Sequence, residues 1–123
     1  MKNLFFLFGL FFGVLLLFPA ESYAQWQPDV RLTNDPANSR TSGYGAWCIA
    51  SSGSVVHVVW YDNRDGNNEI YYKRSTDEGI SWGTDTRLTN NSAFSYTPSV
   101  TVTGSVVHVV WHEERDGNAI LYP

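Results

Sequence analysis

The chain has 123 residues, which is enough for one domain at most. It carries 8 Lys and Arg residues against 12 Asp and Glu residues, a formal net charge of −4, so no basic face for nucleic acid is expected. The single cysteine, Cys48, excludes an intramolecular disulfide. Because Cys48 lies in an apolar, strand-like run, we interpret it as a small buried hydrophobic residue rather than a reactive thiol.

The first 24 residues have the composition of a secretory signal peptide. Lys2 supplies a positive charge, an apolar run broken only by glycine covers 4–18, and Ser22–Ala24 places small residues at the two positions that a signal peptidase reads. The alternative is a membrane anchor, but this run is shorter than the roughly 20 residues needed to cross a bilayer. We therefore expect cleavage between Ala24 and Gln25, giving a secreted or cell-surface protein without a stable membrane span.

Internal repeats organise the rest of the chain. Three segments occur twice with few changes: Val55–Trp60 and Val106–Trp111, 64–67 and 115–118, and 26–34 and 82–90. The first two pairs are separated by 51 positions and the third by 56. We expect the difference to lie in a shorter connection between Asn90 and the second valine run, where length variation is tolerated. A unit of about 50 residues is typical of propeller blades.

Each unit divides into short strands separated by turn residues, which predicts an antiparallel, all-β meander. The predicted first strands are 46–51 and 99–103, the second 55–61 and 106–112, the third 69–74 and 119–122, and the fourth 85–89.

The valine runs narrow the choice of architecture. Val55–Trp60 is apolar at successive positions rather than at alternate ones, so both faces of its strand should be covered by neighbouring sheets. A β-propeller provides this cover because each blade lies between two others. The predicted fold is therefore a partial β-propeller with blades of four antiparallel strands. Residues 25–35 would form an outer closing strand, 44–90 the first complete blade and 96–123 an incomplete second blade. A ring needs at least about four blades, so the sequence reads as the N-terminal fragment of a longer protein.

The segment between the third and fourth predicted strands has a distinctive pattern of residues. Ser75 and Asp77 can accept hydrogen bonds from nearby backbone N–H groups, Gly79 tolerates a positive φ, and Trp82 offers a large packing surface. This S-x-D-x-G-x-x-W pattern resembles the Asp-box, or bacterial neuraminidase repeat, of sialidase-like β-propellers. The resemblance covers the chain from about Trp26 onward and implies a six-bladed propeller. In that family the Asp-box is a structural turn remote from the active site.

The resemblance also implies a set of catalytic residues. Sialidases of this family use three arginines that grip a carboxylate, an Asp acid/base and a Tyr–Glu nucleophile pair. The first arginine belongs to an Arg-Ile-Pro motif, which 42–47 lacks, so Arg40 is the nearest substitute. Arg64 and Asp65 occupy the neighbourhood of the second arginine and the catalytic Asp. They recur at Arg115 and Asp116, however, and a single active site needs such residues only once, so we interpret them as parts of the blade.

Other candidate site residues have structural interpretations that we favour. His57 and His108 recur within apolar strands and are expected to be buried, because no second metal ligand lies at a suitable spacing. A calcium site at Asp62, Asn63 and Asp65 is the alternative to a turn with Gly66 at a positive φ. Arg31 and Arg87 also recur and look like solvated or strand-pairing arginines. Several aromatic residues could stack on sugar rings, although packing is the expected use of most. They are Tyr44, Trp47, Tyr71, Tyr72 and Tyr96.

Two functions follow as hypotheses. The first is a secreted, non-catalytic Asp-box propeller that binds glycans or cell-surface proteins and needs neither a cofactor nor a metal. The alternative is the N-terminal part of an exo-α-sialidase-like glycoside hydrolase, whose remaining catalytic residues would lie in later blades. In either case the fragment itself is expected to be inactive.

Overall fold

The computed structural model describes residues 27–43, 47–115 and 120–122. These residues form eight strands in two antiparallel sheets, neither of which is closed, and they include no helix. The all-β, antiparallel prediction is therefore confirmed. The predicted signal peptide at 1–24 lies outside the described residues, as do Tyr44, Ala46 and Asp116.

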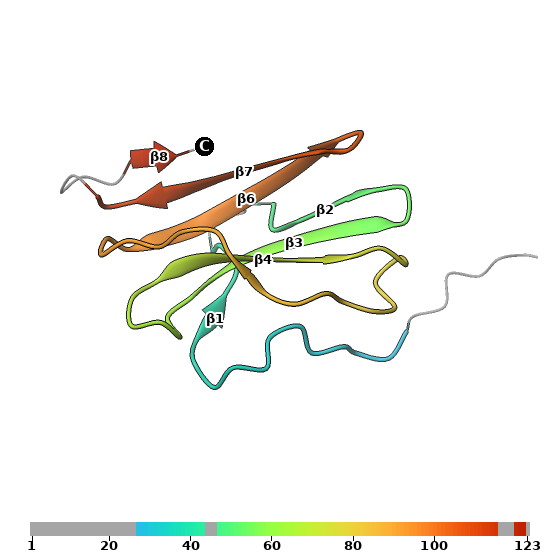
Figure 1. The fold of residues 1–123 in the computed structure, drawn as a ribbon, viewed down its shortest axis with the longest axis horizontal. Helices are drawn as coiled ribbons and strands as arrows, with labels where there is room; N and C mark the ends of the chain where they lie inside the picture. The colour runs from blue at the N-terminus through green and yellow to red at the C-terminus, as the bar shows by residue number, and fades with distance from the viewer. Residues whose placement is uncertain (1–26, 44–46, 116–119, 123) are drawn as a thin grey trace, which may run out of the picture.

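The first sheet, sheet A, contains the four strands predicted for the first unit. Strands β2, β3, β4 and β5 each pair antiparallel with the next along the chain, and the short strand β1 pairs with the end of β3 (Figure 1). The bounds are Ser39–Arg40 for β1, Ile49–Ser52 for β2, Val55–Asp62 for β3, Glu69–Ser75 for β4 and Thr86–Arg87 for β5.

The second sheet, sheet B, repeats this meander with three strands. Strand β6 pairs with β7, and β7 pairs with β8. The register shifts between Tyr96 and Ser99, where Thr97 has a positive φ of 51° and a β-bulge bends β6. The bounds are Ser95–Thr103 for β6, Val106–Glu113 for β7 and Ile120–Tyr122 for β8.

The registers show where the two units differ in length. Ser39 lies opposite Asp62 just as Ser95 lies opposite Glu113. Farther along the strand, Ile49 lies opposite Val58 just as Val100 lies opposite Val109. The extra residues of the first unit therefore fall between β1 and β2. As a result, β1 and β2 are two separate strands, whereas the equivalent residues of sheet B form one continuous strand, β6.

The repeated loops share hydrogen bonds as well as sequence. Arg31 Nε donates to the Thr33 carbonyl oxygen at 2.7 Å, and Arg87 Nε donates to the Thr89 carbonyl oxygen at the same distance. Asp35 and Asn91 likewise accept a hydrogen bond from the backbone N–H two residues later, at 2.8 Å in each case. The sequence repeat is thus also a repeat of local structure.

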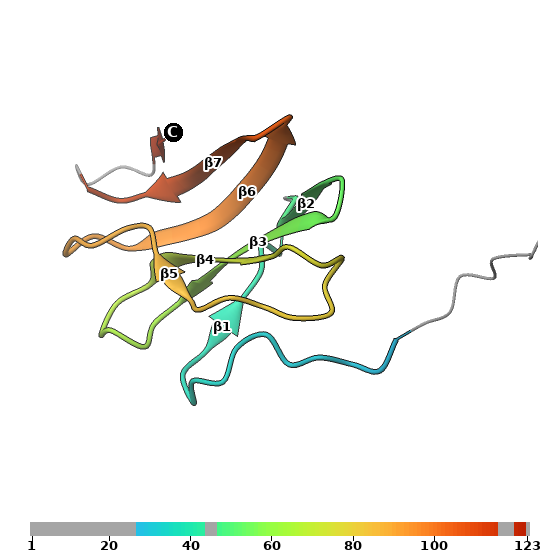
Figure 2. The same cartoon turned by 45° about the vertical axis from the view of Figure 1, so that its right-hand side comes forward.

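Sheet A lies between sheet B and the N-terminal segment 27–38 (Figures 1 and 2). Strand β6 packs against β2, β3 and β4. On the face of sheet A that carries Trp60 and Lys73, the Lys73 Nζ donates to the Leu32 carbonyl oxygen at 2.5 Å. Val59 and Ile70 are fully buried on the opposite face, toward sheet B. Both faces of β3 are covered, but only one of them is covered by a second sheet.

Two expectations of the sequence differ from this arrangement. Residues 27–35 were expected to belong to an outer strand, but no strand is formed there, and the segment crosses the face of sheet A, where the Leu32 carbonyl oxygen accepts a hydrogen bond from Lys73. His57 is buried as predicted, at 5% exposure, and its Nδ1 lies 2.7 Å from the Tyr72 hydroxyl. The prediction is wrong for His108, which is exposed because its face of sheet B points away from sheet A.

Candidate functional site

The turn between β4 and β5 is closed by its own side chains. The Ser75 Oγ accepts hydrogen bonds from the N–H groups of Gly79 at 2.8 Å and Asp77 at 3.2 Å, and it donates to Asp77 Oδ1 at 2.6 Å. Ser81 donates to Asp77 through both its backbone N–H and its hydroxyl. The hydrogen bonds from Ser75 and then Ser81 lower the pKa of Asp77 to about 2. The carboxylate is therefore an ionised acceptor that holds the turn together.

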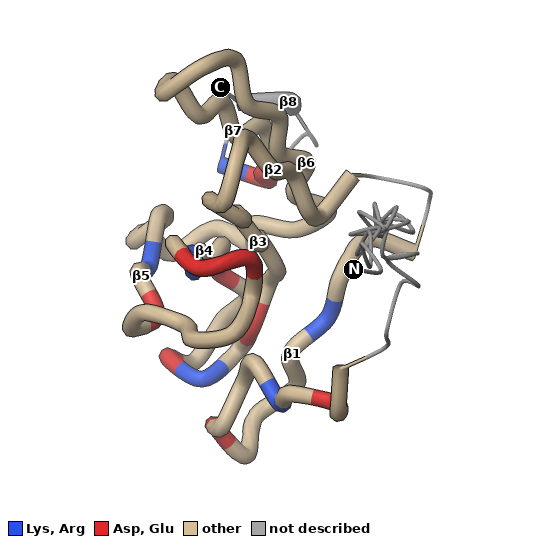
Figure 3. Tube along the Cα trace, turned by 90° about the vertical axis from the view of Figure 1, so that its right-hand side faces the viewer, with Lys and Arg blue, Asp and Glu red and all other residues tan. Residues whose placement is uncertain are grey.

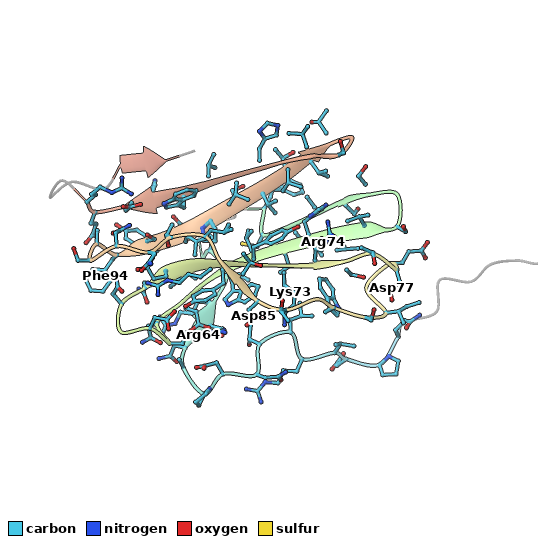
Figure 4. The ribbon with its side chains drawn as sticks, in the orientation of Figure 1. Arg64, Lys73, Arg74, Asp77, Asp85 and Phe94 are labelled. Carbon is cyan, nitrogen blue, oxygen red and sulfur yellow. The ribbon has the colours of Figure 1, made fainter. Side chains whose placement is uncertain are left out.

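Backbone geometry and packing complete this turn. Gly79 has a φ of 90°, and a Cβ atom there would lie 3.7 Å from the Trp82 ring. The preceding Glu78 also has a positive φ, of 61°, and its N–H donates to the Ser54 carbonyl oxygen at 2.8 Å. Trp82 is half-buried and lines a hollow together with Leu32 and its neighbours. The turn thus connects β4 to the β2–β3 hairpin at the end of sheet A marked by Asp77 in Figure 4.

Arg64, a sequence candidate for catalysis, is held by ion pairs within sheet A. Its Nη2 lies 2.8 Å from Asp62 Oδ2, and its Nη1 lies 2.7 Å from Asp85 Oδ2 (Figure 4 labels Arg64 and Asp85). Its guanidinium also lies 4.5 Å from the centre of the Tyr71 ring. The hydrogen bond to Asp62 raises the pKa of Arg64, and the bond to Asp85 adds to this effect. Arg64 therefore acts as a bridge between β3 and the chain leading to β5.

The other two candidates have different surroundings. Asp65 accepts a hydrogen bond from the Tyr71 hydroxyl and lies 3.0 Å from Arg87 Nη1. Arg40 is exposed on β1, where it lines a polar hollow with Tyr61 and Asn63. The structure thus brings Arg64 and Asp65 to the same tyrosine, while Arg40 forms no ion pair with any residue described.

Buried acids at the strand ends were not identified as paired sites from the sequence. Asp62 and Glu113 are both fully buried and occupy the same place in their units. Burial alone would raise the pKa of Asp62, but hydrogen bonds from Arg64 and Ser39 outweigh it and lower that pKa to about 2. Arg115 Nε lies 2.6 Å from Glu113 Oε1, which repeats the pairing of Arg64 with Asp62. The signal that could have revealed these sites is an acid two residues before each repeated arginine.

The one-methylene difference between these two acids has a visible consequence. The Trp111 Nε1 donates to Glu113 Oε2 at 2.9 Å. In the first unit the equivalent acid is the shorter Asp62, and Trp60 Nε1 is buried without a hydrogen-bond partner among the described residues. An unsatisfied buried N–H costs about 1–3 kcal/mol, so sheet A carries a penalty that sheet B avoids.

Two further basic side chains of sheet A, Lys73 and Arg87, are also ion-paired. Lys73 Nζ lies 2.6 Å from Asp85, and Arg87 Nη2 lies 2.8 Å from the fully buried Glu69, which also accepts from the Thr89 hydroxyl. Figure 3 shows acidic and basic residues alternating around β4, β5 and the adjoining loops. The carboxylates of Asp85 and Glu69 thus act as acceptors of charge-assisted hydrogen bonds. The network therefore serves to fix strands to one another.

The repeated Arg-Asp-Gly-Asn loop joins the two sheets. Gly66 has a φ of 107°, which confirms the predicted positive-φ turn. Asn67 Nδ2 donates to the carbonyl oxygens of Asn91 at 3.0 Å and Ala93 at 2.7 Å, and the Ser95 N–H donates to the Asn68 carbonyl oxygen at 2.8 Å. The loop thus determines where the second unit begins relative to the first.

A groove of about 520 Å³ runs between β2 and β6. Trp47 lies at this groove with 77% of its surface exposed, and Ile49 is 59% exposed beside it. Tyr71, by contrast, is buried, and Tyr72 is bonded to His57. Cys48 is half-buried, and its sulfur lies 3.5 Å from the Pro98 carbonyl oxygen. Among the aromatic candidates in the described residues, Trp47 is the exposed one, whereas Tyr96 is half-buried.

The described residues lack both a cluster of metal ligands and a helix that could span a membrane. In that part of the chain, no three His, Cys, Asp or Glu side chains gather as metal ligands would. The same residues include no helix with the length and apolar character needed to span a bilayer.

Comparisons with protein-family models, with curated proteins and with solved structures yield no match to this sequence.

Proposed function

We propose that the chain is part of an exported, sialidase-like Asp-box β-propeller that binds glycans or cell-surface proteins and does not catalyse hydrolysis. In this proposal 44–90 is the first blade, and 96–123 belongs to the second. Support comes from the repeated antiparallel sheets, from the face-to-face packing of sheet A with sheet B, and from the hydrogen-bonded turn around Ser75 and Asp77.

One observation carries the non-catalytic part of the proposal. Arg64 and Asp65, the residues nearest to the expected arginine and catalytic Asp, are both engaged within sheet A by Asp62, Asp85 and Arg87. A catalytic acid must be free to exchange a proton with the substrate. An aspartate shared between Tyr71 and Arg87 is instead a structural acceptor.

A fluorogenic sialoside assay with the whole chain tests this part of the proposal. We expect no hydrolysis above the buffer rate, both for the wild type and for Asp65→Ala. A measurable turnover that Asp65→Ala abolishes, and that an exposed-site control such as Thr76→Ala retains, would refute the proposal. Screening the chain on an array of neutral and acidic glycans tests the binding part separately.

The exo-sialidase-like alternative has one observation in its favour. Arg40 is exposed and lines a polar hollow with Asn38, Asn63, Asn68 and Tyr61. A guanidinium without a partner carboxylate could bind the carboxylate of an acidic sugar. Weakened binding of sialic acid by Arg40→Gln, together with sialoside turnover, would favour this alternative.

A further inference from the structure

The groove between β2 and β6 is formed by two strand edges that join at one end. The Val100 N–H donates to the Trp47 carbonyl oxygen at 2.7 Å, and next to this hydrogen bond the Cys48 sulfur lies 3.5 Å from the Pro98 carbonyl oxygen. The Val59 N–H donates to the Cys48 carbonyl oxygen, so alternate residues of β2 direct their backbone groups toward β3. Ile49 and Ser51 therefore direct their N–H and C=O groups into the groove. Within the described residues these groups have no partner.

The walls of the groove combine an aromatic platform with small polar groups. Trp47 and Ile49 form the exposed apolar side. Hydroxyl groups come from both strands, and the remaining wall is aliphatic. The further lining residues are Ala50, Ser51, Ser99, Val100, Thr101 and Val102. Apolar walls with a few hydrogen-bonding groups are typical of small-ligand sites, and about 520 Å³ lies within their usual size of roughly 300–1,000 Å³.

The groove has no charged lining residue. Charged residues of sheet A lie instead on β1, β3, β4, β5 and the adjoining loops (Figure 3). A ligand with a carboxylate or phosphate would lose its hydration here without gaining a counter-charge, which is unfavourable. The lining thus favours a neutral ligand that has one apolar face and several hydroxyl groups.

We propose that this groove is a binding site for a neutral sugar, such as a hexose or an N-acetylhexosamine, whose ring lies on the Trp47 indole. The sugar hydroxyls would bond to Ser51, Thr101 and the free backbone groups of β2. This inference rests on the proposed glycan-binding function and specifies the ligand class. An extended peptide is a poorer fit, because β2 offers an edge of only 4 residues and the Trp47–Val100 hydrogen bond closes one end.

The test is a titration of the whole chain with lactose and with 3′-sialyllactose, followed by tryptophan fluorescence and calorimetry. These probes differ by one acidic sugar. We expect lactose to bind at least as tightly as 3′-sialyllactose, and Trp47→Ala to weaken lactose binding by about tenfold. Phe94→Ala, which removes an aromatic ring that is 49% exposed and lies away from the groove, should leave binding unchanged. Circular dichroism checks that both variants fold.

The possible outcomes separate this inference from the function on which it rests. Binding of 3′-sialyllactose alone, or lactose binding that Trp47→Ala leaves intact, would overturn the neutral-sugar site and leave glycan binding standing. Failure to bind any sugar on a glycan array, together with binding of an extended peptide in the groove, would overturn the site and leave protein binding. Binding to neither would refute both.

Discussion

Removal of the Ser75 hydroxyl should destabilise the β4–β5 turn more than the loss of any other single side-chain group. Ser75 is 1% exposed, and its Oγ takes part in three hydrogen bonds, with the Gly79 N–H, the Asp77 N–H and the Asp77 carboxylate. Ser75→Ala removes all three and leaves two backbone N–H groups without their acceptor. With about 0.5–1.5 kcal/mol for each bond, and the 3.2 Å contact the weakest, we expect a loss of about 2–3 kcal/mol in the free energy of unfolding.

Urea denaturation followed by tryptophan fluorescence measures this loss. For a small domain with a slope of about 1–2 kcal/mol per molar urea, the midpoint should fall by roughly 1–3 M. Thr76→Ala is the matched control, because Thr76 is exposed in the same turn. If the midpoints of the two variants agree within about 0.3 M, the hydroxyl does not hold the turn and the reasoning is wrong.

Three further outcomes follow from the structure. Gly79→Ala should cost about 1–2 kcal/mol in denaturation experiments because φ is 90°, whereas Gly83→Ala, with no positive φ, should cost less. Asp62 has a pKa of about 2 in the folded protein, against an ordinary value of 3.8, so its contribution to the free energy of unfolding should be complete above about pH 4 and lost toward pH 2. Acid titrations of the wild type and of Asp62→Asn, followed by circular dichroism, measure this loss. Equally steep unfolding curves for the two proteins would contradict the expectation. Glu113→Asp should withdraw the carboxylate from Trp111 and lower the melting temperature by a few degrees, about 1 kcal/mol, and an unshifted Trp111 indole N–H resonance in NMR spectra would argue against it.

The sequence predicted best those features that depend on the residues of a single strand or turn. The doubly apolar run Val55–Trp60 predicted a strand with a neighbouring sheet on each face, and β3 has sheet B on one face but the segment 27–38 on the other. The repeat of Arg64 and Asp65 favoured a structural role, and both residues form ion pairs in the turn that follows β3. The sequence did not predict that Asp85 and Arg87 are their partners. These residues come close to Arg64 and Asp65 only because β5 pairs with β4.

Burial was less predictable wherever it depends on what lies beside a sheet. His57 and His108 have the same neighbours in sequence, yet only His57 is covered, because sheet B packs on its face. Trp47 was expected to pack more readily than to bind a ligand, yet 77% of its surface is exposed at the groove between β2 and β6. Residues 27–35 cross the face of sheet A, where Lys73 donates a hydrogen bond to the Leu32 carbonyl oxygen. No local sequence pattern predicts this contact.

The two copies of the hexapeptide Val-Val-His-Val-Val-Trp provide an internal reference for dynamics. An amide proton exchanges with solvent at an intrinsic rate that depends on its immediate sequence neighbours, and these are the same for most positions of β3 and β7. Any difference in deuterium uptake between the matched amides therefore reports only how often each strand opens. One sample can thus compare a strand in the middle layer with its twin in the outer layer, and this ratio needs no mutant and no second protein.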